Sequence, residues 1–457
     1  MPYSFPSTTG REMFMALRAQ RASWRRLTSV AIVLLAATPL FLVRIDGAAA
    51  LPTCDPSAPA TCSLRQLADL AGIRIGSIAE PYEITDPAYA SVLAREFNSV
   101  TPENALKWYA TQPSNGTWDF SGADEIVRFA DDHDMTIRGH TLVWAQDTYT
   151  VAWVKSIADP VALKTVVENH ITATMNHFAG KIPRWDVVNE PLASVGTGQS
   201  TSVFWSLGPE WIADAFRLAH TLDPSAELWL NEYGTDWVPG KHEALVALVS
   251  GLVDAGVPIK GVGLQMHRLP GAVLETEKFA SQMRDFTALG LEVAVTELDI
   301  PVAPDDPGAL QSQALEYARV VSACLMVDGC VEVTLWGLTD GSTWLDSVGL
   351  FATPTRPLLF DNAFAPKPAY DAVRGVLAEA VSPTPPSVTQ PPQITTASEP
   401  RLPATGSSTA LLAAAGLLLV AGGLLVSRAA SVGNQRRMQN TESHRITEVA
   451  SVPELPE

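Results

Sequence analysis

Two glutamates follow short apolar runs in the chain. Glu190 closes the run 185–189, and Glu297 closes the run 293–296. A carboxylate at the end of an apolar segment is costly to bury unless it is partnered or functional. Paired carboxylates are the groups that cleavage of a glycosidic bond needs, because one protonates the leaving oxygen while the other attacks or activates water. A structural ion pair is the alternative reading for each glutamate alone.

Short apolar segments alternate with amphipathic ones along most of the chain. Strands are expected at 73–79, 99–101, 136–143, 184–188, 227–230, 259–264, 291–295 and 331–335. Helices are expected at 86–97, 121–133, 160–178, 209–222, 240–255, 275–289 and 309–327. This alternation predicts an α/β fold with a parallel sheet. Eight units in about 320 residues fit a closed (β/α)₈ barrel, the TIM barrel, better than an open sheet.

Polar residues directly follow seven of the expected strands. They are Glu103 and Asn104, His140 and Trp144, Asn189 and Glu190, Asn231 and Glu232, Gln265 and His267, Glu297 and Asp299, and Trp336 and Asp340. In a barrel these positions are the carboxyl ends of the strands, where the active site lies. Glu190 and Glu297 end strands four and seven, which lie across the barrel mouth from each other, so their side chains are expected to converge.

Seven motifs carry a family resemblance in their order and spacing. They are FNSVTPEN at 97–104 with Lys107 and Trp108, GHTLVW at 139–144, WDVVNE at 185–190, GLQMH at 263–267, TELD at 296–299, WGLTD at 336–340 with Trp344, and KPAY at 367–370. Together they resemble family-10 glycoside hydrolases, the retaining endo-1,4-β-xylanases, over residues 66–378. The resemblance implies a single catalytic barrel that acts on xylan without a cofactor or metal.

The same resemblance implies a role for each matching residue. Glu190 would be the acid/base and Glu297 the nucleophile. Asn189 would bind the 2-hydroxyl of the sugar being cleaved, where charge develops in the transition state. His267 would hold Glu297 in place and would itself be braced by Asp299.

The substrate-binding residues implied by the resemblance form two groups. Glu103, Asn104 and Lys107 would grip the neighbouring sugar on the non-reducing side. The subsite of the cleaved sugar would be lined by His140, Trp144, Gln265, Trp336 and Trp344, with tryptophan faces available for stacking on a sugar ring.

The chain departs from the family pattern at three places that border these motifs. Ala145, Gln146 and Asp147 stand where the family usually has His-x-Gln, Gly234 replaces an Asn, and Arg268 replaces a Leu after His267. These departures leave the preferred xylan open.

Alternative functions predict other sequence features. A retaining β-glucanase on the same barrel and a non-catalytic glycan-binding protein are the alternatives, although a binding module would need neither glutamate. A barrel metallohydrolase would carry His-x-His on its first strand, where this chain has Ala79 and Glu80. With 49 Asp and Glu against 31 Lys and Arg, the net charge of −18 disfavours a nucleic-acid partner.

Both ends of the chain carry targeting features. Basic residues from Arg18 to Arg26, an apolar run at 27–43 and Ala48 to Ala50 predict a cleaved export signal at 1–50, or else an uncleaved membrane anchor. Residues 51–381 would form the catalytic domain. The Pro-, Ser- and Thr-rich segment 382–401 reads as an extended stalk.

The segment 402–457 resembles the sortase sorting signal of Gram-positive surface proteins. It contains the pentapeptide LPATG at 402–406, an apolar span at 411–426 and then basic residues. In that family sortase would cut after Thr405 and join it to peptidoglycan, with the apolar span in the membrane only transiently. The protein is therefore expected to be secreted and anchored to the cell wall. The tail after Arg428 is longer than is usual in the family.

Four cysteines occur as two close pairs, and four cysteines allow three connectivities. Disulfides persist outside the cytoplasm, so local bridges are expected in an exported protein, between Cys54 and Cys62 and between Cys324 and Cys330. The second pair also resembles a family disulfide.

Overall fold

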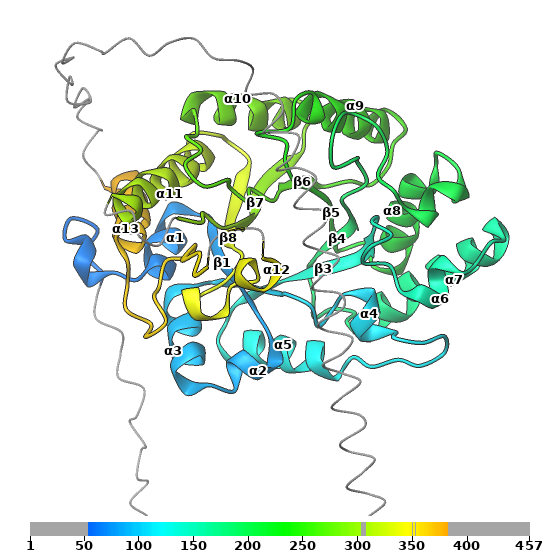
Figure 1. Cartoon of the computed structure of the whole chain (residues 1–457), viewed down its shortest axis with the longest axis horizontal. Coiled ribbons are helices and arrows are strands. Elements are labelled where there is room, and N and C mark those ends of the chain that lie inside the picture. The colour runs from blue at the N-terminus through cyan, green and yellow to red at the C-terminus, as the bar shows by residue number, and fades with distance from the viewer. Residues whose placement is uncertain (1–53, 303–307, 350, 352, 383–457) are drawn as a thin grey trace, which may run out of the picture. The chain divides into compact units, whose positions relative to one another are not determined.

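The computed structural model describes residues 54–302, 308–349, 351 and 353–382. Eight parallel strands close into a barrel in which each pairs with the next and β8 pairs with β1 (Figure 1). The strands are β1 (Arg74–Ala79), β2 (Ser99–Pro102), β3 (Thr136–Trp144), β4 (Arg184–Asn189), β5 (Glu227–Glu232), β6 (Gly261–Leu264), β7 (Glu292–Leu298) and β8 (Cys330–Leu335). The expected (β/α)₈ fold is confirmed.

Helices surround the barrel. The long ones are α1 (Leu64–Ala71), α3 (Pro87–Glu96), α5 (Ser121–Asp132), α7 (Pro160–His177), α8 (Trp211–Leu222), α9 (Lys241–Asp254), α10 (Thr276–Thr287), α11 (Ala309–Leu325) and α13 (Pro368–Val381). Short helical turns are η1 (Pro59–Thr61), α2 (Pro81–Ile84), α4 (Trp108–Thr111), α6 (Ala152–Lys155), η2 (Val203–Leu207), η3 (Asp340–Ser342) and α12 (Leu345–Val348). All seven expected helices are present.

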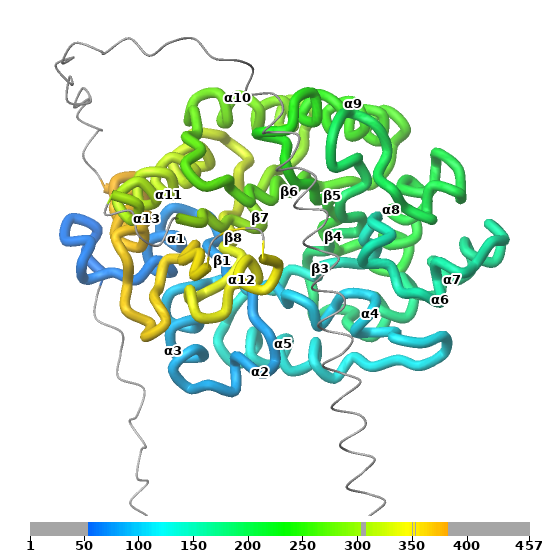
Figure 2. The backbone as a smooth tube through the Cα atoms, in the orientation of Figure 1, coloured from blue at the N-terminus to red at the C-terminus, as the bar shows by residue number. Residues whose placement is uncertain are grey.

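Local sequence signals start several of these helices. Ser63 forms a capping box with Gln66 before α1, which ends at Gly72 in the left-handed conformation. The Asp159 carboxylate accepts from the first backbone amides of α7, and Pro160 occupies the first turn. Helices α1 and α13, from opposite ends of the described chain, lie side by side (Figure 2). Together they complete the outer layer between β8 and β1.

The residues between strands and helices form a continuous apolar core, whereas charged residues are buried among the strands themselves. Arg138 and Arg184 both pack over the ring of Trp229, at 4.8 and 4.5 Å from its centroid. Arg138 pairs with Asp186, and Arg184 pairs with Glu332. Burial opposes ionisation of Asp186, but Arg138 and His140 outweigh it and lower its pKa. The buried charges are therefore paired.

The two local disulfides are confirmed. Cys54 is bonded to Cys62 ahead of α1, and Cys324 is bonded to Cys330. The second bridge links the last turn of α11 to the first residue of β8, so it closes the connection that leads to Trp336.

Candidate active site

The two glutamates lie at the carboxyl ends of opposite strands. Glu190 directly follows β4, and its backbone is left-handed with φ +57°. The backbone amide of Glu190 donates to the backbone carbonyl of Asn231 at 2.9 Å. Glu297 is the next-to-last residue of β7, and its backbone amide donates to the Gln265 carbonyl at 2.9 Å. A left-handed non-glycine residue is strained, and such residues concentrate at functional sites.

Glu297 is held by hydrogen bonds from two sides. One carboxylate oxygen lies 3.1 Å from Nε2 of His267, and the other accepts from Nδ2 of Asn231 at 2.6 Å. Nδ1 of His267 lies 2.9 Å from Asp299, which also accepts from Nε1 of Trp344 at 2.7 Å. Burial alone would lower the pKa of His267, but Asp299 and Glu297 outweigh it and raise that pKa to about 10. The imidazole is therefore a cation that holds two carboxylates.

The pKa values of the two glutamates shift in opposite directions. Burial raises the pKa of Glu190, and the charge of Glu297 raises it further. The hydrogen bond that Gln265 donates opposes this rise. For Glu297, burial also favours the neutral form, but His267, His140 and Lys107 outweigh it and lower the pKa. One carboxyl group is thus suited to carry a proton and the other to stay ionised.

Amides connect the two carboxyl groups. Gln265 Nε2 donates to Glu190 at 3.0 Å and to Asn189 Oδ1 at 3.2 Å. Asn231 Nδ2 also donates to Asn189 Oδ1, at 2.9 Å. The sequence placed Asn231 at the active-site end of its strand but assigned it no role. A single hydrogen-bond network therefore fixes the positions of both glutamates.

The residues after β2 form one polar group next to Glu297. Lys107 Nζ and Tyr109 Oη both donate to Asn104 Oδ1, at 3.2 and 2.6 Å. The Asn104 amide donates to Glu80 at 2.6 Å. Burial and the nearby charge of Glu80 raise the pKa of Glu103 to about 7, although the charge of Lys107 lowers it. Glu103, Asn104 and Lys107, which the family resemblance assigns to one sugar, therefore lie together.

Aromatic side chains enclose this group. Lys107 Nζ lies over the rings of Trp144 and Trp336, at 4.6 and 5.7 Å from their centroids. Trp336 meets His140 edge to face at 5.2 Å, and Trp344 meets His267 at 5.1 Å. The expected site residues, drawn from strands β2, β3, β4, β6, β7 and β8, are therefore joined in one contact network.

Comparison with known proteins settles the family. The model of glycosyl hydrolase family 10 matches residues 63–376. The chain belongs to glycosyl hydrolase family 10. It is 36% identical over 333 residues to endo-1,4-beta-xylanase 2 of Claviceps purpurea, covering 72% of this chain and 96% of that protein.

Solved structures of the family share the fold. Native xylanase 10B from Thermotoga maritima matches with a TM-score of 0.65 and 34% identity, over 70% of this chain and 99% of that one. Xylanase 10B from Thermotoga petrophila in complex with xylobiose matches with a TM-score of 0.66 and 33% identity, over 70% and 98%.

The cell-wall address is also matched. The LPXTG cell wall anchor motif model covers residues 394–431, which identifies a wall-anchored surface protein. Within residues 54–382, apart from the undescribed positions, no helix is long and apolar enough to cross a membrane. The export signal 1–50, the stalk, Thr405 and the apolar span 411–426 lie outside the described residues.

The residues that depart from the family pattern make specific contacts or adopt a specific backbone conformation near the site. Arg268 is buried and forms ion pairs with Asp236 and with Glu316, the latter at 2.7 Å. Asp147 accepts from the amide of Val203 at 2.7 Å. Gly234 has φ +69°, a conformation that favours glycine. Sequence reasoning did not anticipate the partner Asp236.

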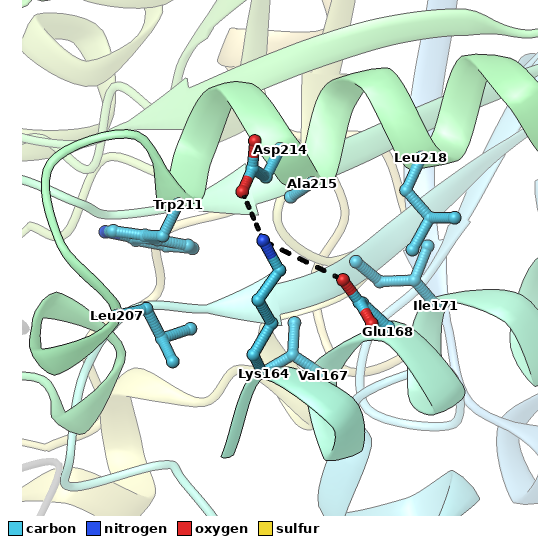
Figure 3. A pocket seen from close by; sticks show the side chains of 9 residues that line it. All are labelled: Lys164, Val167, Glu168, Ile171, Leu207, Trp211, Asp214, Ala215 and Leu218. Carbon is cyan, nitrogen blue, oxygen red and sulfur yellow. Dashed lines mark hydrogen bonds and ion pairs between the residues drawn. The ribbon is translucent and has the colours of Figure 1, made fainter. Parts of the chain in front are cut away.

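Two recesses lie away from the carboxyl ends of the strands. A cavity of about 560 Å³ at the opposite barrel end is lined by the first residues of β1, β4, β5 and β7. Another, of about 30 Å³, lies between α7 and α8, where Lys164 bridges Asp214 and Glu168 beside Trp211 (Figure 3). Neither contains one of the glutamates that the family motifs single out.

Proposed function

We propose that this family-10 enzyme is a retaining endo-1,4-β-xylanase that hydrolyses internal bonds of xylan through Glu297 as nucleophile and Glu190 as acid/base. The observation that carries this proposal is the pair of buried carboxyl groups at the ends of β4 and β7 whose pKa values shift in opposite directions. Relatives and structural neighbours named as xylanases support the choice of substrate.

In the first step, an ionised oxygen of Glu297 attacks the anomeric carbon while the glycosidic carbon–oxygen bond breaks. Glu190, protonated because its burial raises its pKa, gives its proton to the departing oxygen. The His267 cation and the Asn231 amide hold Glu297 on its two oxygens, which fixes its direction of attack. The product of this step is a glycosyl ester of Glu297.

In the second step, water replaces the leaving sugar and attacks the same carbon. Ester formation removes the charge of Glu297, so the pKa of Glu190 falls after the first proton transfer. Glu190 then takes the proton of water, and Glu297 leaves with its charge restored. Two inversions at one carbon give net retention.

The surrounding residues would bind the sugars. Asn189, held by Gln265 and Asn231, is poised to donate its amide to the 2-hydroxyl of the cleaved sugar. Glu103, Asn104 and Lys107 would bind the next sugar on the non-reducing side. The subsite of the cleaved sugar would be lined by His140, Gln265, Trp336 and Trp344 and by the ring edge of Trp144, whose faces are occupied by Tyr149 and Lys107.

The test of this function is product analysis with the purified protein on xylan and, in parallel, on mixed-linkage β-glucan. We expect xylo-oligosaccharides of several lengths from xylan at early times and little release from β-glucan. Faster cleavage of β-glucan would support the glucanase alternative. Binding of xylan without any products would support a non-catalytic glycan-binding protein.

We also propose the organisation of the whole chain. Residues 1–50 would be the export signal, 51–381 the catalytic domain, 382–401 the stalk and 402–457 the sorting segment. Sortase would join Thr405 to peptidoglycan, with the barrel held outside by the stalk. The family match at 63–376 and the anchor motif at 394–431 support the order of the catalytic and sorting segments.

A further inference from the structure

Trp144 stands at the centre of the site, and both of its faces are occupied. Tyr149 stacks on one face, with ring centroids 3.7 Å apart and planes 10° from parallel. Lys107 Nζ lies 4.6 Å over the same ring, and because the tyrosine occupies one face, the ammonium must lie on the other. Trp144 therefore has no face left for a sugar.

Tyr149 and Lys107 thus lie on opposite sides of Trp144. Lys107 belongs to the group with Asn104, which binds on the non-reducing side in the proposed function. Tyr149 therefore lies on the face of Trp144 away from Lys107, and the charge of Glu190, the proposed acid/base, acts on its hydroxyl.

Contacts of the turn that carries Tyr149 agree with this placement. The Tyr149 amide donates to the Gln146 carbonyl at 3.0 Å, and Gln146 Nε2 donates to the backbone carbonyl of Glu190 at 3.3 Å. Asp147 in the same turn accepts from the Val203 amide. The turn is therefore tied both to the acid/base and to the chain that follows it.

The side chain of Tyr149 is half-buried, so its ring and its hydroxyl can both contact a ligand. Burial, and then the charge of Glu190, raise the pKa of its hydroxyl, so it stays protonated. Among the described residues, Trp144 is the ring it stacks on, and its hydroxyl has no hydrogen-bond partner. No second ring stacks on Tyr149 among the described residues, so its hydroxyl and the exposed part of its ring are available to a ligand. Tyr233 lies close enough to both Tyr149 and Glu190 for their charges to raise its own pKa.

We propose that Tyr149 is a specificity-determining residue that contacts the xylose ring on the reducing-end side of the cleaved bond. Its free face packs on the ring, and Trp144 backs it. This inference rests on the proposed function, because it takes Glu190 as the group that meets the leaving oxygen. The same contact would bind an acceptor sugar that enters after the first product has left.

Partition of the covalent intermediate tests this contact. With dinitrophenyl β-xylobioside, Glu297 attacks the anomeric carbon and dinitrophenolate leaves. The oxygen of water or of added methyl β-xyloside then attacks the same carbon, Glu190 takes its proton, and the bond to Glu297 breaks. Water gives xylobiose, and the acceptor gives a methyl xylotrioside.

We expect Tyr149→Ala to lower the ratio of trioside to xylobiose by about 3–10-fold at fixed acceptor concentration, from the loss of ring packing. Tyr149→Phe, which keeps the ring, should retain most of the transfer. The ratio does not depend on the fraction of enzyme that is folded. Release of dinitrophenolate shows separately that each variant is active.

Tyr82→Ala is the matched control. Tyr82 is 69% exposed on α2, and the acids whose charges act on its hydroxyl are Glu83, Glu103 and Glu80, with Glu190 not among them. Its loss should leave the partition ratio unchanged. An unchanged ratio in Tyr149→Ala, or an equal fall in Tyr82→Ala, would overturn the assignment of Tyr149. Failure of the unaltered enzyme to release dinitrophenolate would instead overturn the proposed function.

Discussion

At the scale of single residues, the ionisation of Glu297 depends on His267. Its imidazole lies 3.1 Å from the carboxylate and is among the groups that lower the pKa of Glu297. In the proposed mechanism the ionised form attacks, so activity should fall at acid pH as Glu297 becomes protonated, and at alkaline pH as Glu190 loses its proton.

Replacement of His267 should therefore raise the pKa of Glu297. We expect His267→Gln to move the acidic limb of the kcat/KM profile to higher pH and to lower the maximum by about 10²-fold. The alkaline limb, set by Glu190, should move less. A profile lowered at every pH with its acidic limb in place would show that His267 does not control this ionisation.

The sequence located the glutamates but not all of their partners. Glu190 and Glu297 could be found because each stands at the end of an apolar run, a position that the fold converts into the barrel mouth. Asn231 was missed as a partner because its contact with Glu297 joins β5 to β7, 66 residues apart. Tyr149 was missed because its stacking depends on the path of a turn that no periodicity describes.

At the scale of elements, Arg268 links three segments behind the site. It follows His267 and pairs with Asp236 after β5 and with Glu316 on α11, while its amide donates to the Asp299 carbonyl at 3.0 Å. Both acid partners are buried. Burial raises the pKa of Asp236, which Arg268 opposes.

Removal of Arg268 should leave a buried acid without its cation. We expect Arg268→Leu to lower the free energy of unfolding by about 3–5 kcal/mol, measured by urea denaturation. The double variant Arg268→Leu with Asp236→Leu, which removes both charges, should recover part of that loss. Equal stability of the single variant and the unaltered protein would contradict the role given to this ion pair.

Strand and helix order could be predicted because a parallel barrel repeats one pattern. Each expected strand overlaps an observed one, and β7 extends three residues further, to Leu298. Helices α1 and α13 were not expected because neither lies between two strands. The capping pair Ser63 and Gln66 was nevertheless a readable start signal for α1.

At the scale of the whole molecule, the anchor motif determines where the enzyme works. If sortase uses Thr405, Thr405→Ala should shift most of the xylanase activity from the wall fraction to the medium or membrane. Activity per molecule should stay unchanged, because the barrel ends well before this position. Undiminished activity in the wall fraction of cells that carry the variant would contradict covalent attachment.

Rescue by azide tests whether Glu297 forms a covalent intermediate that Glu190 helps to form and release. Glu190→Ala should still react with dinitrophenyl β-xylobioside, whose leaving group needs no proton, and the intermediate should accumulate. Azide needs no base, so we expect faster turnover and a xylobiosyl azide of retained β-configuration. An azide of α-configuration, or rescue by azide in Glu297→Ala instead, would contradict this mechanism.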